Sequence, residues 1–397
     1  MSFSPLMRTF LIIASAISAT AALVAQPRLT LDDAAMARTI VERLALAPGE
    51  RVISVAHPGT FADLIPHLRY EVMRAGGVDL GVIDVLREPL PATFDPAVLQ
   101  RGAREARGSV KSMLRDVDAA IMLPGANTSH PAYLAMQDWL KDDLVERRGR
   151  RTIHFHWVEA GSAYPIAGQP LPPRVAIDAL YQRALVDTNY AALAASQRKF
   201  AAALRTGEVH ITSPAGTDLR FRVGDRPVNF QDGNASRSRS AAGVTLIDKE
   251  IELPAGAIRV APIEDSVDGT IAFPPSMWGG TRVEGLVLTF ARGRVTDVRA
   301  TTGRDAVDNE LAGAGNAGRA FREFALGLNP LLAIPTDGVR RWIPYYGYGA
   351  GVVRLSLGDN TELGGTVGGG YVRWNFFTDA TVAIGSDVWV KDGRLIR

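Results

Sequence analysis

The chain has 397 residues, a formal net charge of +2 and no cysteine. It therefore has no disulfide framework, thiolate nucleophile, iron–sulfur cluster or cysteine-built zinc site. All six histidines lie within the first 210 residues, so a metal site in the second half would need oxygen ligands, which suit Mg²⁺, Ca²⁺ or Mn²⁺ better than Zn²⁺. The near-neutral charge, without a basic block that contains interleaved aromatic residues, argues against nucleic-acid binding.

Residues 1–25 have the pattern of a secretory signal peptide. A single charge at Arg8 precedes the apolar run Phe10–Val24, and small residues lead up to Gln26. The run is shorter than the roughly 20 residues that span a membrane, although an uncleaved anchor is the alternative. We expect a periplasmic or secreted protein that starts near Gln26 and has no membrane contact after signal removal.

Helices and strands are predicted to alternate over residues 26–206. The predicted helices are Leu29–Leu46, Phe61–Ala75, Leu99–Asp116, Ala132–Leu144 and stretches within Arg174–Leu204; the predicted strands are Arg51–Ala56, Val78–Val85, Ala119–Leu123 and Thr152–Val158. This alternation is typical of βαβ units. It predicts an N-terminal layered α/β domain with a parallel sheet.

From residue 207 onward the sequence predicts a second, β-rich (α+β) domain that extends to residue 397. Its predicted strands are Glu208–Ile211, Leu219–Val223, Ala257–Val260, Thr270–Ala272, Val283–Ala291, Arg294–Ala300, Val352–Leu357, Val372–Phe377 and a short one at Leu395. One predicted helix, Asp305–Leu326, interrupts them. The polar and basic segment Asn234–Ala242 is expected to be a mobile loop.

Four ordered motifs in the second half resemble the aminopeptidase T / aminopeptidase S family of metallo-aminopeptidases. They are Glu252-Leu-Pro-Ala-Gly256 with Val260–Thr270, Gly216–Leu219, Glu323–Pro330, and Leu357–Asn360 with Gly364-Gly365. The resemblance covers most of the chain after the signal segment. It implies that the β-rich domain is similar to the catalytic domain of that family, and that the protein is a homodimer.

The resemblance also implies five ligands, two Glu, two His and one Asp, that hold two divalent metals. The matching positions here are Ala257, Glu323, Arg354, Arg373 and Asn375, where the last two flank Trp374 in place of a His-Trp-Asp triplet. Four of the five are changed, and arginine has no lone pair to donate to a metal. We therefore expect no metal and no other cofactor.

The two arginines suggest a recognition site instead. We predict that Arg354 and Arg373 clamp a carboxylate or phosphate while Glu323 orients them, because guanidinium groups bind such anions in bidentate fashion. The candidate catalytic residues are Glu323, Arg354, Arg373 and Asn375, and the candidate substrate-binding residues are Arg354, Arg373, Trp374, Tyr346 and Tyr348. The alternative is a buried salt bridge that fills an inactive site.

Three functions remain open from the sequence. The first is a metal-independent enzyme or binding protein for a small anionic or peptide-derived ligand. The second is an active metallo-aminopeptidase that uses substitute carboxylates, drawn from Glu264, Asp265, Glu323, Asp359 and Glu362. The third is a non-catalytic pseudoenzyme or scaffold.

Other motifs carry weaker signals. His154-Phe-His156 places two imidazoles on one face of a strand, with Glu159 close by, which suits a metal or a base, but packed histidines are favoured. Gly313–Gly318 fits G-x-G-x-x-G without following a predicted strand, which argues against nucleotide binding. Ser266 and Ser356 would need a nearby base to act as nucleophiles.

Two segments flank the arginine positions. The aromatic run Trp342–Tyr348 is suited to line a cavity or a dimer interface, although ordinary packing is favoured. The glycine-rich loop Gly364–Gly370 joins the two arginine-bearing strands and is either a gate or a long hairpin turn.

Overall fold

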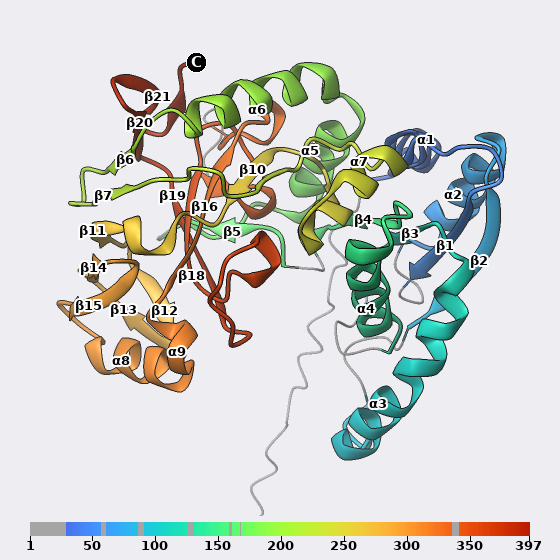
Figure 1. Cartoon of the computed structure of the whole chain (residues 1–397), viewed down its shortest axis with the longest axis horizontal. Helices are drawn as coiled ribbons and strands as arrows, with labels where there is room; N and C mark the ends of the chain where they lie inside the picture. The colour runs from blue at the N-terminus through green and yellow to red at the C-terminus, as the bar shows by residue number, and fades with distance from the viewer. Residues whose placement is uncertain are drawn as a thin grey trace, which may run out of the picture.

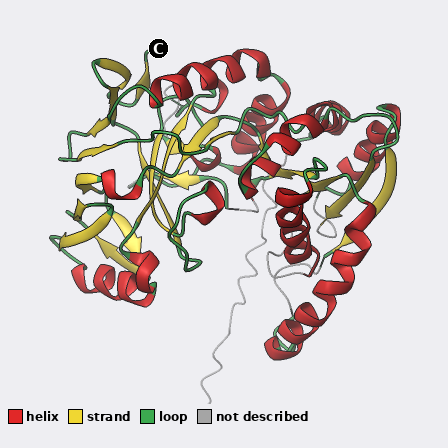
Figure 2. Cartoon of the chain, viewed as in Figure 1, coloured by secondary structure: helices red, strands yellow, loops and turns green. Residues whose placement is uncertain are grey.

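The computed structural model describes residues 29–56, 61–85, 91–124, 131–158, 161–166, 168–335 and 341–397. The expected signal peptide lies outside these residues. In Figure 1 an α/β portion, coloured blue to dark green, lies beside a β-rich portion coloured mostly yellow to red, and Figure 2 shows the same division by secondary structure. No helix within the described ranges is long and apolar enough to cross a membrane.

The α/β portion is built on a five-stranded, fully parallel sheet in the order β2-β1-β3-β4-β9. Its elements are α1 (Asp33–Leu44), β1 (Arg51–Ala56), α2 (Leu64–Arg74), β2 (Val78–Asp84), α3 (Pro96–Met113), β3 (Ala119–Met122), α4 (Pro131–Glu146), β4 (Arg151–Phe155) and β9 (Glu250–Leu253); α5 (Arg174–Val186) and α6 (Tyr190–Leu204) follow before the second portion. The predicted α/β fold with a parallel sheet is confirmed. Strands β3 and β4 are buried along their whole length, as expected for a sheet covered on both faces.

The fifth strand comes from the second half of the sequence. β9 pairs with β4 in the register Thr152↔Glu250 to Phe155↔Leu253. The predicted boundary at residue 207 thus does not separate the two sheets completely, because a strand from after the boundary completes the parallel sheet formed by the residues before it. The reason is that β4 would otherwise be an exposed edge with unpaired backbone groups.

The β-rich portion holds two larger antiparallel sheets, ordered β19-β18-β16-β10-β8 and β15-β14-β11-β7-β6-β20-β21-β22. Its strands are β6 (Val209–Thr212), β7 (Asp218–Phe221), β8 (Val228–Phe230), β10 (Ala257–Val260), β11 (Asp268–Ala272), β12 (Ser276–Trp278), β13 (Thr281–Val283), β14 (Val287–Ala291), β15 (Arg294–Arg299), β16 (Phe321–Gly327), β18 (Val353–Gly358), β19 (Val372–Phe377), β20 (Thr381–Ile384), β21 (Asp387–Lys391) and β22 (Arg394–Leu395). β17 (Trp342–Ile343) pairs with β5 (Tyr164–Pro165).

Two sequence predictions were wrong in this portion. The predicted helix Asp305–Leu326 is in fact α8 (Arg304–Gly313) and α9 (Gly315–Gly318), followed by strand β16. β16 is buried along its whole length, so its sequence shows no alternation that would separate it from a helix. Within the predicted loop Asn234–Ala242, the structure has the short helix α7 (Arg237–Ala242), whose N-cap is Ser236.

A buried ion pair fixes the entry to β9. Lys249 Nζ lies 2.8 Å from Asp143 Oδ2, and both side chains are fully buried. The Asp143 carboxylate also accepts backbone hydrogen bonds from Arg148, Gly149 and Arg150 in the turn between α4 and β4. One carboxylate thus ties the start of β9 to the strand that β9 extends.

We expect Lys249→Met to lower the free energy of unfolding by about 3–5 kcal/mol, because it leaves a buried carboxylate without its cation. Lys111→Met is the matched control. Lys111 of α3 lies 2.7 Å from Asp142, the neighbour of Asp143 in α4, but this ion pair is exposed to solvent. That control should cost about 0–1 kcal/mol. Equal shifts in the urea unfolding midpoint for the two variants would contradict the anchoring role.

Candidate functional site

One face of the sheet β19-β18-β16-β10-β8 carries a set of charged side chains. The register pairs Arg259 of β10 with Ala325 of β16, and Ala325 with Arg354 of β18. Glu323 of β16 pairs with Ser356 of β18 in the same ladder. Because directly paired residues share a face, Arg259, Glu323, Arg354 and Ser356 all project from the same side.

This face meets the parallel sheet at the turn between β9 and β10. After β9 the chain passes through Pro254-Ala-Gly256 and enters β10, so Glu252 of one sheet lies close to Arg259 of the other. Gly256 is required in the turn because a Cβ there would lie 2.6 Å from the carbonyl oxygen of Tyr348. The Leu-Pro-Ala-Gly motif therefore joins the two sheets at the site.

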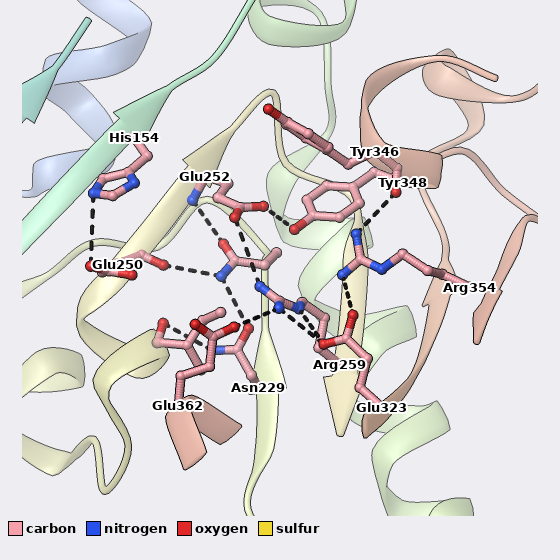
Figure 3. Close-up of polar contacts among 12 residues, drawn as sticks. His154, Asn229, Glu250, Glu252, Arg259, Glu323, Tyr346, Tyr348, Arg354 and Glu362 are labelled. Carbon is pink, nitrogen blue, oxygen red and sulfur yellow. Dashed lines mark hydrogen bonds and ion pairs between the residues drawn. The ribbon is translucent and has the colours of Figure 1, made fainter. Parts of the chain in front are cut away.

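Glu323 is fully buried at the centre of the face (Figure 3). Its Oε2 accepts hydrogen bonds from Arg259 Nη2 at 3.0 Å and from Arg322 Nη1 at 2.6 Å. Its Oε1 lies 2.9 Å from Arg354 Nη2 and accepts a hydrogen bond from Ser356 Oγ at 3.2 Å. Both carboxylate oxygens are therefore occupied by protein groups.

Arg322 reaches this face through an irregularity in β16. The register between β16 and β18 shifts between Phe321 and Glu323, which is the signature of a β-bulge. Without the bulge, neighbouring residues would point to opposite faces of the sheet. The shift allows Arg322 and Glu323 to meet on one side.

The three guanidinium groups keep Glu323 ionised. Burial alone would raise the pKa of this carboxyl, but Arg259, Arg354 and Arg322 overcome the burial effect and hold the pKa far below its usual value. An uncharged Glu323 would leave three buried cations without this partner, so the network is stable only as an ionised set.

The more accessible charges of the network are carboxylates. Glu362, in the 3-10 turn Thr361–Leu363, accepts hydrogen bonds from Arg259 and Arg322, and its side chain is 36% exposed. The Glu252 side chain is 18% exposed, lies 3.8 Å from Arg259 Nη1 and accepts a hydrogen bond from the Tyr348 hydroxyl. The side chains of Arg259, Arg322 and Arg354 are all nearly sealed from solvent.

Aromatic rings enclose Arg354. Its guanidinium carbon lies 5.8 Å from the ring centroid of Tyr348 and 5.3 Å from that of Trp374, both within cation–π range. Its Nη1 donates to the carbonyl oxygen of Tyr346. Tyr346 has φ 51°, a left-handed conformation that costs energy in a non-glycine residue and is often found at functional sites. Trp374, which is 39% exposed, forms the outer wall.

A second polar pair lies on the parallel sheet next to Glu252. His154 Nε2 is 4.0 Å from Glu250 Oε1, and that oxygen has no hydrogen-bond partner among the described residues. Burial raises the pKa of Glu250 to about 8, and Glu362 and Glu252 act in the same direction. Burial lowers the pKa of His154 to about 3, with a smaller effect from His156. At neutral pH both groups are therefore uncharged.

The structure does not bring the two predicted clamp residues together. In β19, Trp374 pairs with Ser356 and Phe376 with Arg354, so these aromatic residues share the face of Glu323. Arg373 and Asn375 lie on the opposite face because side chains alternate along a strand. The expected convergence of Arg354 and Arg373 on one anion is therefore wrong.

Arg373 has a different environment. It donates to Glu310 Oε1 at 2.8 Å and to the carbonyl oxygen of Met277, and its guanidinium lies 3.4 Å from the ring centroid of Trp278. Asn375 donates to the carbonyl oxygen of Leu355. These contacts give both residues packing partners behind the site. Among the predicted site residues, Glu323, Arg354, Trp374, Tyr346 and Tyr348 do lie together.

Sequence reasoning missed several members of the cluster. Arg259 and Arg322 were not proposed, and Glu250 and Glu252 were not assigned a role in the site. A signal for Arg259 existed, because it is a charged residue in a short strand two positions after Ala257 and so on the same face. Arg322 depends on the bulge, which the sequence does not reveal.

The residues at this site do not fit the two metals that the family implies. Glu323 is the one carboxylate at the five matched positions, and its oxygens are already bound to guanidinium and hydroxyl groups. No group of three or more His, Cys, Asp or Glu side chains suited to a metal occurs in the described part of the chain. Glu159 of the His154–His156 hypothesis lies outside it.

Two of the proposed substitute carboxylates are engaged elsewhere. Glu264 contacts Arg226, Asn360 and Thr366, while Asp359 accepts hydrogen bonds from Thr361, Gly369 and Gly370. Of the predicted serines, Ser356 Oγ donates to the ionised Glu323, whereas Ser266 Oγ donates to backbone carbonyls.

Comparisons with known proteins agree with this architecture. Residues 188–333 match the family model described as thermophilic metalloprotease (M29). The match confirms the resemblance to the aminopeptidase T family that the sequence motifs indicated.

Two solved structures share the fold over nearly the whole chain. The wild-type AmpT of Thermus thermophilus has 18% identity and a TM-score of 0.60, and the alignment covers 92% of this chain and 99% of that one. The 2,5-dihydroxypyridine dioxygenase of Pseudomonas putida KT2440 has 14% identity and a TM-score of 0.58, with 92% and 96% covered. No curated protein sequence matches the chain.

We expect the Glu250 carboxyl to make stability depend on pH. Its pKa is raised from 4.5 to about 8 in the folded protein, so its contribution is fully present below pH 4.5 and is lost as the pH rises towards 8. Glu250→Gln removes this titration. The free energy of unfolding of the wild type, relative to Glu250→Gln, should therefore fall by up to about 1.4 kcal/mol per pH unit between pH 5 and 8.

Urea unfolding at several pH values measures this difference. Glu208→Gln, at a half-exposed position on the surface, is the matched control. Its free energy of unfolding should depend on pH in the same way as that of the wild type. The low pKa of His154 in the folded protein makes stability rise with pH between about 3 and 6.5, but His154 is present in all three proteins, so this contribution cancels in the comparison. Parallel profiles for the wild type and Glu250→Gln would contradict the assignment.

Proposed function

We propose that this protein is a metal-independent, aminopeptidase T-like binding protein for a small peptide-derived ligand. The single observation that supports this is the buried Glu323, whose two oxygens are covered by Arg259, Arg322, Arg354 and Ser356 at the position where the family holds its metals. The arginine–glutamate network supplies the positive charge that a metal centre would otherwise supply. It offers no activated water for hydrolysis, so binding is the better-supported role.

The exposure of the charged groups favours a ligand with an amino group over an anion. A ligand that approaches this face meets Glu252, Glu362 and the rim residue Trp374 first, while the arginine side chains are sealed and paired beneath them. Carboxylates and an aromatic face attract an ammonium group. Of the anionic and peptide-derived ligands that the sequence suggested, the peptide-derived class fits the geometry better.

Export and assembly belong to the same proposal. The signal-peptide pattern of residues 1–25 and the absence of cysteine suit a periplasmic or secreted protein. The resemblance to aminopeptidase T supports a homodimer. The similarity to a protein described as a dioxygenase shows that this fold hosts different reactions, so the fold alone does not select one.

The second candidate is a non-catalytic scaffold in which the network is purely structural. The near-complete burial of Glu323 and of the three arginines favours it, since a buried and internally paired network needs no ligand. A metallo-aminopeptidase with substitute ligands is the third candidate, and the separate engagement of Glu264 and Asp359 disfavours it.

Metal analysis tests the first and third candidates. We expect the purified protein to contain no stoichiometric transition metal by elemental analysis. We also expect no aminopeptidase activity on aminoacyl-p-nitroanilides after addition of Zn²⁺ or Co²⁺, because Glu323 cannot exchange its guanidinium partners for a metal. Stoichiometric metal together with activity that a chelator abolishes would overturn the proposal.

Ligand binding separates the first candidate from the second. We expect dipeptide amides with a free amino group to bind by calorimetry, and their N-acetylated forms to bind at least about 10-fold more weakly, because a charged hydrogen bond is lost. Glu252→Gln should weaken binding of the free amine by a similar factor, whereas the surface variant Glu208→Gln should not. Equal affinity for both peptide forms, preference for dicarboxylates, or no binding would contradict the amine site.

A further inference from the structure

Exposed arginines gather at the amino-terminal edge of the parallel sheet, opposite the end that carries His154. Arg147 and Arg148 lie in the turn between α4 and β4, Arg115 follows α3, and Arg237 begins α7. All four are exposed. We name this set the arginine surface.

Hydrogen bonds hold these segments side by side. Arg237 Nε donates to the carbonyl oxygen of Arg148 at 3.0 Å, and Arg148 Nη1 donates to that of Arg115 at 3.4 Å. Arg147 Nη1 donates to the carbonyl oxygen of Gly243, just after α7. At Gly149, a Cβ would lie 2.5 Å from the carbonyl oxygen of Arg237, so the turn and α7 are in close contact.

The positive charge of this surface is only partly neutralised. The carbonyl oxygens that orient Arg147 and Arg148 are uncharged, whereas Arg237 Nη1 also lies 4.0 Å from Oε1 of the buried Glu50, which binds Arg151 more closely. Of the exposed carboxylates nearby, Glu146 lies closer to Arg150, at 3.1 Å, than to Arg148, at 3.9 Å. Asp116 pairs with Arg51 at 3.5 Å. An excess of cationic groups therefore faces solvent, in a chain whose total net charge is +2.

Exposed apolar side chains lie among these arginines. Val145 is 86% exposed, Met113 is 68% exposed and Val244 is 58% exposed. Each is within two residues of a member of the arginine surface or of Gly243, which Arg147 contacts. Cations beside protruding apolar groups are typical of proteins that lie on a lipid surface, where guanidinium groups meet phosphates and apolar side chains enter the headgroup boundary.

A nucleic-acid partner fits this surface less well. Single-stranded nucleic acids are bound by aromatic side chains that stack on bases. The largest exposed aromatic side chains of the described chain, Tyr70, Phe94 and Trp374, belong to other segments.

We propose that the arginine surface docks the protein on membranes that contain anionic phospholipids, as a peripheral contact and not a span. The proposal revises the expectation of no membrane contact after signal removal. Because the surface is at the opposite end of the parallel sheet from His154, the site around Glu323 stays accessible when the protein is docked.

Vesicle sedimentation tests the proposal on the mature chain, residues 26–397. We expect binding to vesicles of phosphatidylcholine with 30% phosphatidylglycerol, little binding to pure phosphatidylcholine, and release in 0.5 M salt. The double variant Arg115→Gln/Arg148→Gln should lower the partition coefficient about 25-fold, at about 1 kcal/mol for each arginine. Val145→Asp should lower it further without loss of fold, because Val145 contacts little of the protein.

The control variants, Arg282→Gln/Arg299→Gln and Met277→Asp, change exposed residues of the same types on the β-rich portion and should leave vesicle binding unchanged. Thermal melting verifies that every variant is folded. Absence of vesicle binding, equal loss with the control variants, or binding of RNA in place of vesicles would overturn the proposal. So would a change of oligomeric state in the surface variants, because the arginine surface would then be an interface between copies of the chain.

Discussion

The ionised carboxylate of Glu323 is the interaction on which this site depends. A fully buried carboxylate is costly unless cations and hydrogen bonds surround it, and three guanidinium groups from β10, β16 and β18 do so here. In turn, each arginine is buried only because Glu323 and the neighbouring carboxylates compensate it. The network therefore constrains three strands at once, and the loss of one member would leave the others as uncompensated charges.

The same network lies where two sheets are joined by a few residues of chain. β9 completes the parallel sheet and β10 begins next to it in the antiparallel sheet, so Glu252 and Arg259 come from different sheets and still touch. This explains why the Leu-Pro-Ala-Gly motif, which the family resemblance places just before a metal ligand, is present here although the ligand position itself is Ala257. The turn has a structural function that is independent of the metal.

Much of the fold could be predicted from the sequence, because local patterns determine it. β1, β10 and β19 begin and end at the residues predicted for them, and the alternation of helices and strands predicted the parallel sheet. β9 could not be placed in that sheet, because pairing of strands far apart in sequence leaves no local signal. β16 was read as a helix, since a strand buried on both faces lacks alternation.

The site was predicted in part for similar reasons. The motifs located Glu323, Arg354 and the aromatic residues around them, but a motif gives positions along the chain and not the face to which each side chain points. The register of β18 and β19 places Arg373 on the face of the sheet opposite Glu323, whereas a bulge in β16 places Arg322 on the same face as Glu323. These outcomes depend on strand pairing, which only the assembled sheet reveals.

The origin of β9 also affects the order in which the protein folds. Ile153 and Ile251 are paired in neighbouring strands although about 100 residues separate them along the chain, and such distant pairings form slowly. The last strand of the parallel sheet cannot be added until residue 253 has emerged from the machinery that synthesises or translocates the chain. Until then β4 is an open edge, and the first half of the protein is the part that most needs protection from aggregation.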